Sequence, residues 1–192
     1  LHEAGENALG EEPRLAKMDW VAKRARRSAN QVREGTLEVC APKQFLGLCA
    51  MIHRLARAAR DQPLRRCYLH GDPHFGNFIF GPDGLYGIDV TDRGVGPVEI
   101  DVARILTRAF YSFPDASAET GFAGLSDGDW GSFAHGYGRD CRGSPMMALF
   151  VANQILNDWM IIHPDHLVTR PVRKQRFEKL KAIFHAMRDS GY

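Results

Sequence analysis

The chain has 192 residues, of which 44% are hydrophobic and 25% charged, and its formal net charge is +2. That length suits one domain or one lobe of a larger protein, and the composition is typical of a globular protein. A net charge this small gives no argument for a nucleic-acid or membrane partner. No apolar run approaches the roughly 20 residues of a membrane-spanning helix. The N-terminus shows no secretory signal, and the four cysteines have no metal-binding spacing. We therefore expect a cytoplasmic protein with reduced thiols.

The N-terminal third predicts a loop followed by helices. Residues 1–14 are rich in Glu and Gly and predict a loop or linker. Residues 19–34 carry five basic side chains, which favour a solvent-exposed helix face; an anion-binding surface is the alternative. Residues 42–60 place apolar side chains at the i, i+3, i+4, i+7 spacing of a helix. We expect residues 1–43 to form an N-terminal linker and helical segment, and residues 44–192 to form the main domain.

Residues 78–80 and 85–88 are predicted to be the two strands of a hairpin. The Gly-Pro-Asp-Gly sequence between them favours a three-residue loop at 82–84, in which a type I turn is closed by a left-handed Gly. This register places Asn77 opposite Asp89, on the same face at the open end of the hairpin. A loop of two residues would place them on different faces, because side chains alternate along a strand.

The remainder of the chain predicts helices. Apolar spacing, with Pro, Ser and Asp at the helix starts, gives helices over 98–111, 126–138 and 144–162, and a last helix that begins at Pro171. The His-Pro-Asp-His run at 163–166 is interpreted as a helix-terminating loop in preference to a two-histidine metal site. The expected fold class is therefore α+β, predominantly helical, with one small hairpin.

The hairpin is preceded by the most informative sequence in the chain, His-Gly-Asp-Pro-His-Phe-Gly-Asn at residues 70–77. Asp72 supplies a carboxylate that could orient a hydroxyl group. Asn77 and Asp89 supply side-chain oxygens, the ligand type that Mg²⁺ prefers. Phosphoryl transfer requires this combination, because its catalysis consists mainly of positioning and charge neutralisation.

This ordered set, together with Gly-Val-Gly-Pro at 94–97 and Asp-Val-Ala at 101–103, resembles the catalytic signature of the aminoglycoside phosphotransferase and choline kinase family. The resemblance covers residues 66–106 well and the helical tail only loosely. It implies a protein-kinase-like fold. Residues 44–192 would then be its C-terminal lobe with a catalytic-loop hairpin, and residues 1–43 a remnant of the hinge or N-terminal lobe.

The resemblance also implies roles for the site residues. Asp72 matches the catalytic carboxylate that accepts or orients the proton of the substrate hydroxyl. Asn77 and Asp89 match the Mg²⁺ ligands. The phosphoryl donor would be ATP or GTP.

Two further residues match structural positions of the catalytic loop. His70 matches the histidine that holds the loop in shape, and Asp101 matches the buried acid at a helix start that accepts backbone N–H groups of the loop. His74 and Asp92 lie within the motif, but their roles stay open.

The leading hypothesis is a small-molecule kinase that transfers the γ-phosphoryl group of a nucleotide to a hydroxyl of an aminoglycoside, choline or a related amino-alcohol or sugar. It requires a nucleotide-binding lobe in the full-length protein, because the 69 residues before His70 contain no G-x-G-x-x-G sequence. Candidate acids for a cationic-substrate pocket are Asp115, Glu119, Asp127, Asp129 and Asp158.

Two alternatives remain open at this point. A pseudokinase-like module would bind a nucleotide or ligand without turnover. A metal-dependent hydrolase could use His70, Asp72 and His74 as alternating ligands on one strand face.

Overall fold

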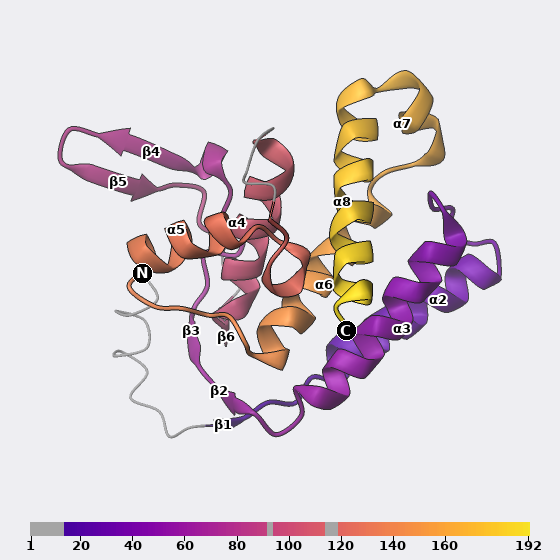
Figure 1. Cartoon of the computed structure of the whole chain (residues 1–192), viewed down its shortest axis with the longest axis horizontal. Coiled ribbons are helices and arrows are strands. Elements are labelled where there is room, and N and C mark those ends of the chain that lie inside the picture. Colours follow the sequence, from indigo (N-terminus) through magenta and orange to yellow (C-terminus); the bar gives the residue numbers. More distant parts are fainter. Residues whose placement is uncertain (1–13, 92–93, 114–118) are drawn as a thin grey trace.

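The computed structural model describes residues 14–91, 94–113 and 119–192. Within these ranges the chain is predominantly helical, and Figure 1 shows one hairpin extending away from the helical body. The predicted α+β class is confirmed. The strands form three antiparallel pairs: β1 (Arg14–Leu15) with β2 (Pro63–Leu64), β3 (Arg66–Tyr68) with β6 (Val95–Pro97), and β4 (Phe78–Gly81) with β5 (Gly84–Gly87).

The hydrophobic core is built around α6 (Pro145–Met160). Thirteen of its 16 residues are buried, so this helix needs apolar side chains on nearly every face. It packs against α3 (Pro42–Ala58), α4 (Glu99–Ser112) and α8 (Pro171–Asp189). The other helices are α2 (Asp19–Arg33), α5 (Asp127–Tyr137), α7 (Pro164–Thr169) and the 3₁₀ helices η1 (Phe75–Asn77) and η2 (Phe122–Gly124). In the part of the chain that the structure describes, no helix is long and apolar enough to cross a membrane.

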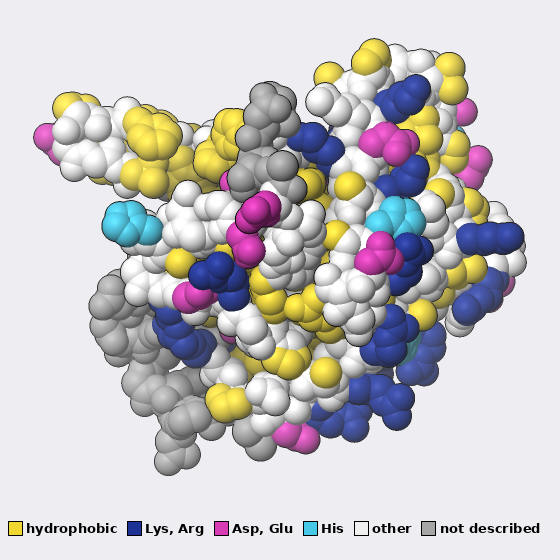
Figure 2. Space-filling view, in the orientation of Figure 1, with side chains coloured by type: hydrophobic (Ala, Val, Ile, Leu, Met, Phe, Trp, Pro, Cys, Tyr) yellow, Lys and Arg dark blue, Asp and Glu magenta, His cyan; other side chains and the backbone are white. Residues whose placement is uncertain are grey.

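The basic N-terminal helix α2 has one buried face and one solvated face. Val21, Ala25 and Ala29 are buried, and α2 packs against α3 in a core that is continuous across residues 43 and 44. The basic side chains on the other face are exposed, and Figure 2 shows Lys and Arg gathered over this part of the molecule. The predicted solvent-exposed helix face is therefore confirmed. The basic residues are Lys23, Arg24, Arg26, Arg27 and Arg33.

The His-Pro-Asp-His run begins a short helix, α7. The His163 Nδ1 atom accepts the backbone N–H of Asp165 at 3.3 Å, and the backbone N–H of His163 donates to His166 Nδ1 at 3.2 Å. These reciprocal bonds form a capping box, which satisfies N–H groups that the first helical turn leaves unpaired. The prediction was right that α6 ends before this run, but wrong that a loop follows. Both histidines act as caps.

All four cysteines are free thiols, and three of them are buried. Burial raises the pKa of Cys49 to about 12, and it also raises the pKa of Cys40 and Cys141. Because the thiolate is the reactive form, buried thiols react slowly with alkylating reagents.

We expect iodoacetamide to modify only the partly exposed Cys141 in the native protein at neutral pH. Cys40, Cys49 and Cys67 should become reactive after unfolding in urea. Mass spectrometry of peptides from native and unfolded samples measures this difference. Rapid native alkylation of Cys49 would contradict the packing of α3 against α6.

Candidate active site

Residues 70–77 form a loop between β3 and β4 that is anchored to the first turn of α4. Asp101 is 2% exposed, and its two carboxylate oxygens accept the backbone N–H groups of His70 at 2.6 Å and Gly71 at 3.1 Å. Hydrogen bonds to a charged acceptor are stronger than neutral ones, so these two bonds fix the start of the loop. They are the contacts that the sequence analysis predicts for Asp101.

His70 holds the loop through its backbone as well as its ring. Its carbonyl oxygen accepts the backbone N–H of Thr91 at 2.9 Å and the Thr91 hydroxyl at 3.2 Å. The buried ring packs against Phe78, with 5.7 Å between ring centroids. Neither ring nitrogen has a hydrogen-bond partner among the described residues. The imidazole therefore contributes packing against Phe78. The hydrogen bonds between residues 70 and 91 are made by the carbonyl oxygen of His70.

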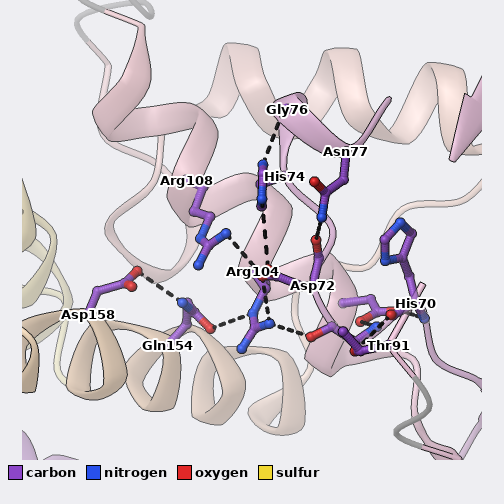
Figure 3. A network of polar contacts seen from close by, with 12 residues as sticks. His70, Asp72, His74, Gly76, Asn77, Thr91, Arg104, Arg108, Gln154 and Asp158 are labelled. Atoms are coloured by element: carbon purple, nitrogen blue, oxygen red, sulfur yellow. Dashed lines mark hydrogen bonds and ion pairs between the residues drawn. The ribbon is translucent and has the colours of Figure 1, made fainter. Parts of the chain in front are cut away.

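Asp72 makes ion pairs with two arginines of α4 (Figure 3). Its Oδ1 atom accepts from Arg104 Nη1 at 3.0 Å and from Arg108 Nη1 at 3.1 Å. Arg104 is largely buried and also donates to the carbonyl oxygen of Gly71. The Asp72 side chain remains one-third exposed, at 33%. The arginines thus fix the direction of a carboxylate that a substrate can still reach.

The same network continues from α4 into α6 and α8. Arg104 Nε donates to Gln154 Oε1 at 3.3 Å, and Gln154 Nε2 donates to Asp158 Oδ2 at 2.9 Å. Asp158 also accepts from the Tyr111 hydroxyl at 3.0 Å and from Arg176 Nη2 at 2.8 Å. Asp158 is therefore a buried acid whose charge is already compensated. It does not provide an open acidic pocket for a cationic substrate.

Tyr111 remains a hydrogen-bond donor in this network. Burial and the negative charge of Asp158 raise the pKa of Tyr111 well above its usual range, against the opposing charge of Arg176. The Arg176 guanidinium lies 4.2 Å from the centroid of the Tyr111 ring, in cation–π geometry, and donates to the Tyr111 hydroxyl. Tyr111, Arg176 and Asp158 are therefore joined pairwise by hydrogen bonds, with an ion pair between Arg176 and Asp158.

His74 caps the 3₁₀ helix η1 that leads into the hairpin. Its Nδ1 atom accepts the backbone N–H of Gly76 at 3.1 Å, while its Nε2 atom lies 3.8 Å from Asp72 Oδ2. A Cβ atom at position 76 would lie 2.9 Å from the His74 ring, so only glycine fits there without a shift. His74 thus shapes the loop and faces Asp72 at the same time.

The hairpin has a two-residue loop, so the predicted three-residue loop is wrong. Gly81 pairs with Gly84, and only Pro82 and Asp83 lie between them. Gly84 has a φ of +144°, a conformation that glycine adopts readily, and this lets it pair within β5 instead of closing the turn. Pairing thus extends one residue further toward the tip than the turn chemistry indicated.

This shorter loop moves the register by one residue. The carbonyl oxygen of Asn77 accepts the N–H of Ile88 at 2.9 Å, so Asn77 pairs with Ile88 and Asp89 lies one position beyond. The prediction that Asn77 and Asp89 face each other is therefore wrong. Both still lie at the open end of the hairpin. The Asn77 side chain donates to the carbonyl oxygen of Asp72 at 3.0 Å, which ties it to the catalytic loop.

Asp89 is exposed and has a φ of +53°, in the left-handed region. A residue other than glycine in this conformation costs on the order of 1–3 kcal/mol, and such strain is found frequently at functional sites. The donor set fits Mg²⁺: Asn77 keeps an amide oxygen as a potential ligand, and Asp89 offers a solvent-accessible carboxylate. Asp92 lies outside the described residues.

The third hypothesis, a hydrolase with a metal held by residues 70, 72 and 74, has no geometric support. No group of three His, Cys, Asp or Glu side chains in the described ranges could hold a metal ion. The His74 Nδ1 atom is used as a helix cap, and the His70 ring is buried against Phe78.

Sequence reasoning missed the arginines that hold Asp72. Asp101, Arg104 and Arg108 have i, i+3 and i+7 spacing, so they share one face of α4. Because Asp101 was predicted to contact the loop, this spacing could have placed the two arginines beside it as well. Gln154, Asp158 and Arg176 come from other helices, and no local signal joins them to the loop.

The comparison with known protein families identifies the family of this chain. The profile of the phosphotransferase enzyme family matches residues 2–135, which is more than half of the chain. The chain belongs to this family. Membership confirms the resemblance to aminoglycoside phosphotransferases and choline kinases, and it implies a protein-kinase-like fold. A search among curated proteins found no match. The loop that Asp101 anchors lies within the matched residues.

Proposed function

We propose that the full-length protein is a small-molecule kinase that moves the γ-phosphoryl group of ATP or GTP to a hydroxyl group. The arrangement that carries this proposal is the fixed, accessible carboxylate of Asp72 beside Asn77. The Asn77 side chain donates to the Asp72 carbonyl oxygen, so the proposed base and a proposed metal ligand are joined by a direct hydrogen bond. Membership of the phosphotransferase family supports the reaction class.

In the proposed reaction the hydroxyl oxygen of the acceptor attacks the γ-phosphorus atom. The bond between that phosphorus and the bridging oxygen breaks, and the nucleoside diphosphate leaves. Asp72 accepts the hydroxyl proton; its main task is to orient the alcohol for in-line attack. Asn77 and Asp89 would hold Mg²⁺, which when bound neutralises charge on the phosphates.

We infer that the chain from residue 44 onward is the C-terminal lobe of the kinase-like fold, and that the hairpin meets a nucleotide-binding lobe. The hairpin presents large apolar side chains to solvent, and Phe80 is 81% exposed. Figure 2 shows them as a hydrophobic strip along the hairpin. Exposed apolar surface of this kind marks contact sites. The others are Ile79, Leu85 and Tyr86. We further propose that the enzyme acts in the cytoplasm.

Asp89→Asn in the full-length protein should raise the Mg²⁺ concentration for half-maximal activity at least about tenfold, because an amide replaces a charged metal ligand. ADP release from ATP, measured at increasing Mg²⁺ with an accepted substrate, tests this. The matched control is Asp83→Asn at the tip of the same hairpin, which should leave the titration unchanged.

An Asp89→Asn titration identical to that of the wild type would remove Asp89 from the metal site. If the wild type binds nucleotide but never releases ADP with any hydroxyl compound, the pseudokinase-like alternative replaces the proposal.

A further inference from the structure

A cavity of about 290 Å³ opens directly beside the proposed base. Residues 74–76 of the catalytic loop line one side of it, Arg108 and Tyr111 of α4 line another, and Arg176 of α8 completes it. Its size matches the lower end of the range for small-molecule sites. Asp72 itself does not line the cavity, but two lining residues contact its carboxylate: His74 Nε2 lies 3.8 Å from Oδ2 and Arg108 Nη1 lies 3.1 Å from Oδ1. A ligand in the cavity is therefore separated from the proposed base by no more than these side chains.

The described lining of this cavity is positive. It contains two arginines and a histidine, and no acid. The described acids that contact these lining residues are Asp72 and Asp158, and each is already bound by arginine: Asp72 by Arg104 and Arg108, and Asp158 by Arg176. Three guanidinium groups thus face two carboxylates in the described network, before any charge on His74 is counted.

The two cavity arginines keep donors for a ligand. The described hydrogen bonds of Arg108 use Nη1, and those of Arg176 use Nη2. A guanidinium has five N–H donors in a planar fork that matches carboxylate and phosphate oxygens. The Nε atoms of both arginines are buried without a described partner, so each guanidinium has an unsatisfied donor. An anion bound between the two side chains would accept from donors that the carboxylates leave free.

We infer that the acceptor is a small hydroxyl compound that also carries a carboxylate or a phosphate group, and that Arg108 and Arg176 bind this anion in the cavity. The inference rests on the proposed kinase function and names its substrate class. It disfavours aminoglycosides and choline, because a cationic acceptor would meet like charge and no open acid among the described residues of the cavity.

The same geometry couples substrate binding to the state of Asp72. Arg108 is 23% exposed and pairs with Asp72 from the cavity side, whereas the more deeply buried Arg104 is also held by Gly71 and Gln154. An acceptor anion would share Arg108 with Asp72 and leave Arg104 in place. Binding of the correct acceptor would therefore weaken the ion pair between Arg108 and Asp72, while Arg104 keeps the carboxylate oriented toward the hydroxyl.

Calorimetric titration of the full-length protein tests this inference. The probes are glycerate and glycerol 3-phosphate, which carry the two candidate anions, and glycerol and choline, which carry none. We expect both anions, or one of them, to bind at least tenfold more tightly than glycerol and choline. Arg108→Gln should weaken that binding on the order of tenfold to a hundredfold. The control Arg188→Gln, an exposed arginine on α8, should not change it.

A second variant tests the site independently of Arg108 and is designed to keep the protein folded. Arg176→Gln alone leaves the buried Asp158 without its cation, so it is combined with Asp158→Asn, which removes both charges together. The double variant should weaken anion binding as Arg108→Gln does. Thermal unfolding of each variant shows that it is folded before it is titrated.

Three results overturn the inference. Glycerol or choline binds as tightly as the anions, none of the four probes binds, or the anions still bind to both arginine variants with the affinity of the wild type. If the variants weaken binding of a non-hydrolysable ATP analogue with Mg²⁺ but not of the anions, the cavity serves the donor phosphates and the inference also fails. Anions that bind through Arg108 but never lead to ADP release leave this anion site intact and overturn the proposed kinase function.

Discussion

Asp72→Asn in the full-length protein should lower ATP-dependent phosphorylation of an accepted substrate by about 10²–10⁴-fold, the usual contribution of a positioned general base. The amide has nearly the same shape as the carboxylate and still accepts from Arg104, but it cannot take the hydroxyl proton. The loss should appear in kcat, because the proposed mechanism has Asp72 act on the reacting hydroxyl and assigns binding of the acceptor to Arg108 and Arg176.

The matched control is Asp83→Asn, since Asp83 lies exposed at the hairpin tip and should tolerate the same change. Circular dichroism and thermal unfolding establish that the Asp72→Asn protein is folded, because the largely buried Arg104 loses a charged partner. If Asp72→Asn keeps activity within tenfold of the wild type, Asp72 is not the base, and the proposed mechanism is wrong.

Asp101→Asn should reduce the free energy of unfolding by about 2–4 kcal/mol, because an amide replaces an anion that accepts two buried N–H groups. The asparagine oxygen can accept one N–H, whereas its NH₂ group meets the other donor. For a chain of this size the midpoint of thermal unfolding should fall by roughly 5–15 °C. Activity should fall as well, because Asp101 holds the backbone of His70 and Gly71 before Asp72.

The control for this stability effect is Glu178→Gln on α8. Glu178 is exposed and pairs with Lys181 at i,i+3, so its replacement should change the free energy of unfolding by no more than about 0.5 kcal/mol. Urea unfolding of both variants measures the difference. An Asp101→Asn protein as stable as the Glu178→Gln protein would show that the loop does not depend on this carboxylate.

Helices could be predicted well because their signals are local. In the last helix, the buried residues recur at the 3.6-residue period of the sequence: Phe177, Leu180, Ile183, Phe184 and Met187. Ser126 and Ser144 cap α5 and α6 at the predicted starts, by accepting an N–H from the first turn. Such boundaries depend on a few adjacent residues, so sequence alone reaches them.

The hairpin shows where local reasoning fails. Pro82 and Asp83 suit either a two-residue or a three-residue loop, and the choice depends on whether Gly84 closes the turn or pairs with Gly81. Small differences in turn energy therefore decide a register that changes which face Asn77 and Asp89 occupy. The prediction identified the hairpin, but it placed Asn77 opposite the wrong neighbour.

By itself, the sequence determined the helical class of the fold and the family, and it indicated residues 70–77 as the candidate catalytic loop. It also indicated the contact between Asp101 and the loop. Each of these rests on residues close together in the chain or on a motif of fixed spacing. Only the tertiary structure decided that Arg104 and Arg108 bind Asp72, and that Arg176 turns the neighbouring cavity positive. Those contacts join residues 18 to 50 positions apart, in the loop and in three helices. Their geometry depends on how α4, α6 and α8 pack, and no local sequence pattern predicts that packing.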